Sequence, residues 1–474
     1  MTYESFKELP AELWCEIARV LPLEDRRRLS TVNSHLRQLL IPILYSTIRI
    51  TSIPSDQPAI ADLVAKYGRH VRGLALTMDL GGRDNPRVWN RDTYSYEEDE
   101  EGDDEYLGMF ADWTSLGLPD ATRQLLAGRT LPEVTSVVIL FASSHDGEDR
   151  EGHGFRYRWE ELWSSGYGTP RPPEELEDDE PWRANLANMW QALAENPGLR
   201  RLAVKNLIPV DVSTWDNPVW AAFLGRLETL ELGLWGNYEH SFLREDYHLF
   251  QGNLNLPFYR HLSEKLRRFA LTAGSVLGSD DEELAPRFEL SGPERCYMPH
   301  LRELYIKDCI VNSDLAVFIA ERGRVNLRVV ELVNCTARTV RVERHVFEVP
   351  FSWADFFETI LKTGERSEIV LERFALVRDW PFELDADGEE APVREAQRLR
   401  EQDGRRGGGG GGSGAFFDGA EQVLFPYVTV FEEGEWSQEG RSNLQRAVAG
   451  DDAKACREVM DIVRANRERR SAKH

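Results

Sequence analysis

The chain has few cysteines, and none of them stands at the spacing of a metal or redox site. Its 474 residues include five cysteines, scattered between Cys15 and Cys456, and no Cys-x-x-Cys pair occurs. Zinc ribbons and thioredoxin-type centres need such pairs. Dispersed thiols in odd number are typical of a reducing compartment rather than of a disulfide scaffold. We therefore expect reduced thiols in a protein of the cytoplasm, the nucleus or both.

Long apolar runs are also missing. No stretch approaches the roughly 20 uninterrupted apolar residues that a membrane-spanning helix needs, and the N-terminus lacks a basic-then-apolar leader. Basic residues are in the minority, 57 against 81 acidic ones, which gives a formal net charge of −24. Such a chain repels phosphates and anionic lipids. The sequence therefore predicts neither a nucleic acid nor a membrane as its partner.

Patterns that carry catalytic chemistry are absent too. The ten histidines form no His-Glu-x-x-His, and neither Gly-x-Ser-x-Gly nor Gly-x-Gly-x-x-Gly after a strand occurs. Six consecutive glycines at 407–412 lack the Lys-Ser/Thr ending of a phosphate-binding loop. We expect a protein that is not an enzyme and that holds no metal and no cofactor.

What the chain does contain is a short apolar strand pattern, Leu-x-x-Leu-x-Leu or a relative, that returns repeatedly. Successive good copies begin 28, 39, 35 and 26 residues apart, and segments of helical character such as 313–323 lie between them. The copies are 199–207, 227–234, 266–273, 301–309 and 327–335, with weaker relatives at 71–80, 134–140 and 371–377. Strands that alternate with helices at such periods predict an α/β solenoid, in which a curved parallel sheet carries outer helices.

In such an array the side chains between the inward leucines form an open surface that commonly binds a partner. Taken singly, each of these positions is better explained as a solvated strand residue, and the binding role is predicted for the surface as a whole. The candidate target-binding residues are Arg201, Lys205, Glu231, Arg268, Arg302, Tyr305 and Arg328. Cys309 and Cys335, nine positions into two copies, are expected to turn inward and hydrogen-bond the backbone.

Three segments interrupt the array. Residues 97–105 hold eight acids in nine positions, within a predicted acidic insertion at 92–106. A second acidic loop is predicted at 168–181 and a disordered glycine-rich loop at 388–415, because these compositions bury too little apolar area. Residues 416–474 then predict a cap, with a strand and a helix that is interrupted near Gly450 and ends in a basic tail.

The first fifty residues are a helical unit of their own. Apolar residues recur every fourth position at Leu9, Leu13, Ile17 and Leu21, which is one face of a helix. A second apolar set follows over 29–40. Helices this short cannot bury all of these side chains against one another, so apolar surface should remain for a partner.

This segment resembles an F-box. The resemblance lies in Leu9-Pro10, Leu13, Ile17, Leu21-Pro22-Leu23 with Asp25, Leu29-Ser30-x-Val32 with Arg37, and Pro42-Ile43-Leu44-Tyr45. An F-box at 1–50 followed by irregular repeats over 51–387 is similar to the F-box/leucine-rich-repeat proteins of the fungal type.

The resemblance implies a substrate receptor of a Skp–cullin–F-box ubiquitin ligase, with the catalytic chemistry in other subunits. It places the contact with the Skp adaptor on Leu9, Pro10, Ile17, Leu21, Pro22, Leu23, Leu29, Val32 and Leu36. Asn33 and Leu36 stand where many members carry Cys and Trp. A scaffold that holds the adaptor without cullin, or a repeat module with a vestigial F-box, is therefore the alternative.

Overall fold

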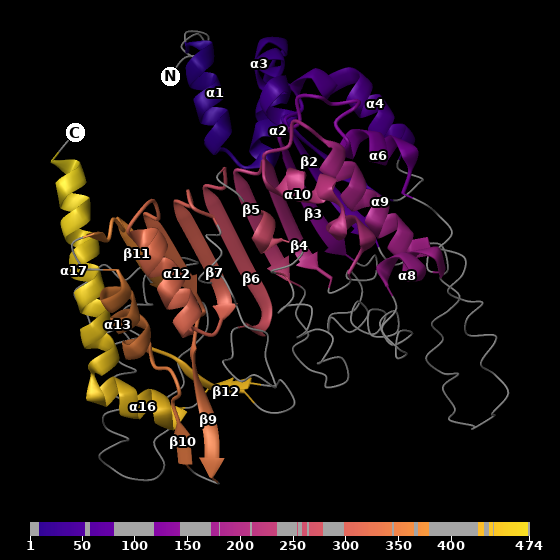
Figure 1. The fold of residues 1–474 in the computed structure, drawn as a ribbon. Coiled ribbons are helices and arrows are strands. Elements are labelled where there is room, and N and C mark those ends of the chain that lie inside the picture. Colours follow the sequence, from indigo (N-terminus) through magenta and orange to yellow (C-terminus); the bar gives the residue numbers. More distant parts are fainter. Residues whose placement is uncertain are drawn as a thin grey trace, which may run out of the picture. The chain divides into compact units, whose positions relative to one another are not determined.

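The structure is a computed structural model of an α/β protein (Figure 1). It describes residues 9–52, 57–79, 118–142, 172–179, 181–208, 211–234, 254, 258–262, 265–277, 298–343, 346–364, 368–378, 425–430, 436–438 and 440–472. The predicted segments at 92–106 and 388–415 lie outside these residues. By its internal contacts the chain divides into two compact units. The first is Met1–Trp159, Gly166–Ala203 and Val212–Phe223, and the second is the remainder.

Nine of the described strands form a parallel sheet, whose spatial order follows the sequence order. Its strands are β1 (Thr47–Thr51), β2 (Gly73–Asp79), β3 (Ser136–Ala142), β4 (Arg201–Leu207), β5 (Thr229–Leu234), β6 (Arg268–Leu277), β7 (Glu303–Cys309), β8 (Val329–Val333) and β11 (Arg373–Val377). Every predicted strand copy is found among them. Parallel neighbours need a crossover between them, and described helices supply it at several places, such as Ser313–Gly323 between β7 and β8.

Alternation along each strand separates a buried face from a half-exposed one. In β5 the buried residues are Leu230, Leu232 and Leu234, while Thr229 and Glu231 are partly exposed. The register keeps these rows aligned, because Leu232 pairs with Leu271 of β6. Repeated leucines of neighbouring strands in the second unit therefore stack on one another, which is how a repeat covers an apolar face that it cannot cover alone.

A left-handed residue ends three of the strands at the same place in the repeat. Asn206, Asp308 and Asn334 have φ of 55°, 57° and 52°, and Asn and Asp are the side chains that tolerate this conformation best. The next residue then turns inward. As predicted, the thiol of Cys309 donates to a backbone oxygen, that of Lys307 at 3.4 Å.

Cys335 occupies the equivalent position one repeat later. Its thiol donates to the backbone oxygens of Ile306 and Val333, each at 3.6 Å, so the prediction holds here too. Burial raises the pKa of Cys335 to about 12 and that of Cys309 well above its ordinary value. Both thiols therefore remain protonated packing groups.

The first unit combines helices with its strands. The helices are α1 (Ala11–Val20), α2 (Leu23–Val32), α3 (Ser34–Leu44), α4 (Gln57–Tyr67), α6 (Asp120–Leu126), α8 (Pro173–Asp179) and α9 (Pro181–Glu195). The fully buried Trp190 of α9 lies at the centre of an aromatic cluster, with ring centroids 5.5 Å from Trp220, 5.9 Å from Trp215 and 6.3 Å from Phe141. These large side chains supply much of the apolar area that holds the unit together.

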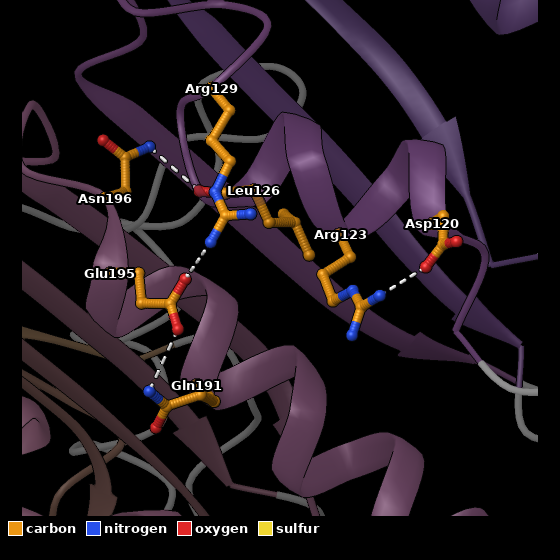
Figure 2. Close-up of polar contacts among 7 residues, drawn as sticks. All are labelled: Asp120, Arg123, Leu126, Arg129, Gln191, Glu195 and Asn196. Atoms are coloured by element: carbon orange, nitrogen blue, oxygen red, sulfur yellow. Dashed lines mark hydrogen bonds and ion pairs between the residues drawn. The ribbon is translucent and has the colours of Figure 1, made fainter.

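A polar joint fixes α6 to the end of α9 (Figure 2). The buried Asn196 donates from Nδ2 to the backbone oxygen of Leu126 at 2.9 Å, and Arg129 pairs with Glu195 at 2.9 Å. Gly128 lies between them with φ +71°, and a Cβ there would stand 2.8 Å from Oδ1 of Asn196. The joint therefore requires glycine at this position.

One prediction in this unit is wrong. Residues 173–179 form the helix α8 rather than part of a loop. Pro173 stands at the first helical position and Glu174 and Glu175 lie in the first turn, which suits both the proline ring and the helix dipole. Glu177 also accepts hydrogen bonds from the backbone N and Oγ of Ser213 at 2.7 Å and 2.5 Å. An acidic segment can thus form a helix where another part of the chain, here Ser213, donates hydrogen bonds to it.

The second unit ends in a helical cap. The helices of this unit are α12 (Ser313–Gly323), α13 (Trp353–Thr363), α16 (Gly440–Ala449) and α17 (Asp451–Ser471), while α10 (Pro218–Leu224) belongs to the first unit except for its last residue. A smaller sheet has the order β10 (Val346–Glu348), β9 (Ala337–Glu343), β12 (Tyr427–Val430) and β13 (Trp436–Gln438). Helices α13 and α17 lie side by side (Figure 1). The predicted interruption is confirmed, since Gly450, with φ +75°, separates α16 from α17.

A buried polar network attaches this cap. Tyr427 donates from its hydroxyl to Asp452 at 2.7 Å, and the other oxygen of Asp452 accepts from the backbone N of Ala354 at 2.8 Å. Trp353 donates from its indole to the backbone oxygen of Pro426 at 3.1 Å. Strand β12 and helices α13 and α17 therefore share one set of bonds. Among the helices described, none combines the length and the apolar character required to cross a bilayer.

Candidate docking surface on the N-terminal helices

The first candidate site is built on helices α1, α2 and α3. Pro10 and Pro22 directly precede the first two helices, and residue Leu21 before Pro22 is extended, which ends α1 at Val20. Asn33 caps α3 by accepting from the backbone N of Leu36 at 2.8 Å. Two prolines and the side-chain amide of Asn33 thus determine where the three short helices begin, within 34 residues from Ala11 to Leu44.

The interior of this bundle is small. Trp14 and Ala18 of α1 are buried, as are Leu36 and Leu40 of α3, and α3 packs against both α1 and α2. Trp14 and Ala18 are four residues apart and form one stripe of α1. The buried stripe therefore lies one position beyond the Leu13–Ile17 stripe that the sequence pattern brings out.

Five further apolar side chains of α1 and α2 face outward. Leu13, Ile17 and Val20 recur on one side of α1, and Leu23 and Val32 belong to α2; the five are between 39% and 82% exposed. Eight large hydrophobic residues are exposed in the described part of the chain, and five of them lie between positions 13 and 32. Scattered apolar residues on a surface are normal, but such a concentration marks an interaction site. We call these five residues the apolar patch.

The predicted adaptor contacts divide into three groups. Pro10, Ile17, Pro22, Leu23 and Val32 are exposed, and Leu9, Leu21 and Leu29 are half-buried. Leu36 is only 5% exposed, so its assignment to the contact surface is corrected: it belongs to the core of the bundle.

Two members of the patch, Leu13 and Val20, are not among the residues for which the sequence predicts a contact with the adaptor. The four-residue spacing between Leu13 and Ile17 places both on one face of the helix and would have been enough to include Leu13. Val20 follows Ile17 by three residues on the same face, whereas the four-residue spacing predicts Leu21, which is half-buried.

Charged side chains surround the patch without covering it. Arg19 pairs with Glu16 on α1, and Arg28 lies 3.6 Å from both Glu24 and Asp25 on α2. All of these groups are about half exposed or more, so such pairs contribute little to stability. The patch thus has an apolar centre and a charged margin, the usual anatomy of a protein–protein contact.

The bundle is joined firmly to the strands that follow it. The backbone oxygen of Ser46 accepts from the backbone N of Arg72 at 2.8 Å and of Gly73 at 2.9 Å. The rings of Tyr45 and Tyr67 stack with centroids 3.6 Å apart. A partner held by the patch would therefore be held in a defined orientation to the beginning of the sheet.

The predicted target-binding residues do not form one group. Glu231, Arg268 and Tyr305 lie together on the half-exposed face of β5, β6 and β7. Arg268 is 3.3 Å from Glu231 and 3.7 Å from Glu303, and its guanidinium lies 4.5 Å from the ring centre of Tyr305. Two strands further on, Arg373 pairs with Glu331 at 3.1 Å. This face is therefore covered by charges that already satisfy one another.

The other four predicted residues lie elsewhere. Arg302 and Arg328 immediately precede β7 and β8 and are exposed at the edge where those strands begin. Arg201 and Lys205 are exposed on β4.

Among the described residues, no three His, Cys, Asp or Glu side chains come together as metal ligands. No family model and no curated protein matches this sequence.

Proposed function

We propose that this protein is the receptor subunit of a Skp–cullin–F-box ubiquitin ligase. The helices α1 to α3 act as an F-box that docks on the Skp adaptor, and the strand array acts as a leucine-rich repeat that binds a protein target. The observation that carries the proposal is the apolar patch, which stands on a bundle whose sequence resembles an F-box.

The energetics support a docking role. The five side chains of the patch are on average about half exposed, and full burial of an aliphatic side chain contributes about 2 kcal/mol. Covering the patch would then contribute about 5 kcal/mol, which is a substantial share of a micromolar contact. In the free chain the same area contacts water, with no structural role that would explain it.

Reconstitution tests the proposal. The full chain is co-expressed with a Skp adaptor, purified, and then mixed with the adaptor-binding part of a cullin. We expect a ternary complex from the wild type and none from a Leu13→Ser/Ile17→Ser/Val20→Ser variant that still unfolds cooperatively. Equal recovery of the adaptor by both chains would contradict the docking assignment.

The same experiment separates the alternative. A chain that retains the adaptor but excludes cullin would be a scaffold rather than a ligase receptor. A chain that retains neither would be a repeat module whose N-terminal helices have another partner.

A further inference from the structure

The nine-stranded sheet has two end strands, β1 and β11, and a helix is bonded to one of them. At the beginning of β11, Asn466 of α17 donates from Nδ2 to the backbone oxygens of Ile369 and Leu371 at 2.7 Å and 3.0 Å. Figure 1 shows α17 alongside this strand. At the other end of the sheet, β2 is the only described strand that pairs with β1. The outer edge of β1 is therefore left without a neighbouring strand among the described residues.

Every second residue of β1 directs its backbone groups toward this outer edge. The backbone oxygen of Ser46 accepts from the backbone N of Gly73 at 2.9 Å, and the backbone N of Ser52 donates to the backbone oxygen of Thr77 at 3.1 Å. The even-numbered residues of the segment therefore bond to β2. Because backbone groups alternate between the two sides of a strand, the odd-numbered residues of β1 point away from β2.

Two of these odd-numbered residues, Thr47 and Arg49, keep their backbone groups unbonded within the described part of the chain. Both residues are exposed. The third, Thr51, accepts at its backbone oxygen from Nε2 of Gln57 at 3.3 Å, which closes that end of the edge. Two N–H and two C=O groups on alternate residues are what an extended chain needs in order to add to a sheet as a further strand.

The side chain of Arg49 determines which strand fits best. It is exposed and forms no ion pair or hydrogen bond with a described residue, and its neighbour across β2 is Ala75. Inside the sheet such a side chain is paired from both adjacent strands, since Arg268 lies 3.3 Å from Glu231 and 3.7 Å from Glu303. Opposite charges on neighbouring strands stabilise their pairing. For Arg49, the matching acid would have to come from a strand added at the outer edge.

We infer that the outer edge of β1 binds an extended segment of a protein partner that carries an acidic residue beside Arg49. A second copy of this chain fits less well, because the outward residues of its own β1 would bring only threonine or arginine opposite Arg49. The inference goes beyond the proposed function, since this edge belongs neither to the apolar patch nor to the half-exposed face of β5, β6 and β7.

Peptide binding to the purified full chain tests the charge that the edge selects. Eight-residue degenerate libraries that differ only at a central glutamate or lysine are titrated by fluorescence anisotropy. We expect the glutamate library to bind about tenfold more tightly, because an opposite-charge pair across the strands replaces a like-charge one. In an Arg49→Glu variant the preference should reverse. The matched control is Arg457→Glu, which changes the net charge equally at an exposed position of α17 and should keep the wild-type preference.

Backbone methylation of the peptides separates strand addition from simple attraction of charges. N-methyl groups are placed in the glutamate library either on the central residue and every second residue from it, or on the residues between these. Only one of the two sets can face β1 in an added strand. We therefore expect one methylated library to lose binding and the other to retain it.

Each outcome decides. Reversed preference in Arg49→Glu, together with loss of binding for one methylated set alone, supports the inference. Equal binding of the two charged libraries to the wild type, equal effects of the two methylation patterns, or the same reversal in Arg457→Glu would each overturn it. A wild-type dimer in analytical ultracentrifugation that Arg49→Glu dissociates would also overturn it, in favour of a second copy at this edge. Adaptor binding is measured on the same samples, which keeps a failure here distinct from a failure of the proposed function.

Discussion

Two valines of the apolar patch allow the docking assignment to be tested with little effect on the fold. Val20 ends α1 and is 82% exposed, and Val32 ends α2 and is 58% exposed. Full burial of a valine contributes about 1.5 kcal/mol. Since most of Val20 and over half of Val32 contacts water in the free chain, covering both contributes about 2 kcal/mol. A Val20→Ser/Val32→Ser variant should therefore bind the Skp adaptor about 30-fold more weakly.

The same change should leave the stability of the bundle almost intact. Serine and valine have similar helix propensities, and only the smaller, buried part of each valine contributes to the core. The assay is calorimetric titration of the adaptor into the full chain, with thermal unfolding measured in parallel.

Val325→Ser/Val448→Ser is the matched control, because both of these valines are 59% exposed and lie far from α1 and α2 in the sequence. If the two double variants bind the adaptor equally well, the patch is not the docking surface and the reasoning from exposed area is refuted.

Three further changes address the fold. Leu36→Ala should lower the free energy of unfolding by about 2–5 kcal/mol, because Leu36 is buried. If urea unfolding shows unchanged stability while adaptor binding is lost, Leu36 is a contact residue and its place in the core is contradicted. Gly128→Ala should destabilise more than Gly450→Ala, since both have positive φ but only Gly128 has Asn196 within 3 Å of the new Cβ; equal losses would contradict the polar joint. Burial raises the pKa of Asp452 above its ordinary 3.8, so the folded chain keeps a proton that the unfolded chain releases. The free energy of unfolding should then fall as the pH rises through and above 3.8, relative to an Asp452→Asn variant, and a parallel pH dependence of both chains would contradict this.

The repeated strands, and the residues that end or interrupt the elements, could be predicted from the sequence. The Leu-x-x-Leu-x-Leu copies became consecutive parallel strands, because alternation within a strand and the helical segments between strands are local properties. The break at Gly450 and the inward Cys309 also follow from single residues whose backbone preferences are strong. The existence of surplus apolar surface on the N-terminal helices followed from counting leucines against the size of the bundle.

Which side chains form that surface was decided only by tertiary packing. Leu13 and Leu36 both fit an apolar helix face, yet α3 buries Leu36 and leaves Leu13 exposed. Arg267 and Arg268 are neighbours in sequence, but among the described residues Arg268 alone pairs with carboxylates of adjacent strands. Helix α8 likewise formed from an acidic segment, where Ser213 binds Glu177.

The physical reason is the range of the forces involved. Periodicity and propensity act between residues a few positions apart, so they determine which helices and strands form and which of their faces are apolar. Burial and charge pairing depend on groups that are distant in sequence. The sequence by itself therefore determined the array and the presence of surplus apolar surface, and the tertiary structure decided which residues form that surface.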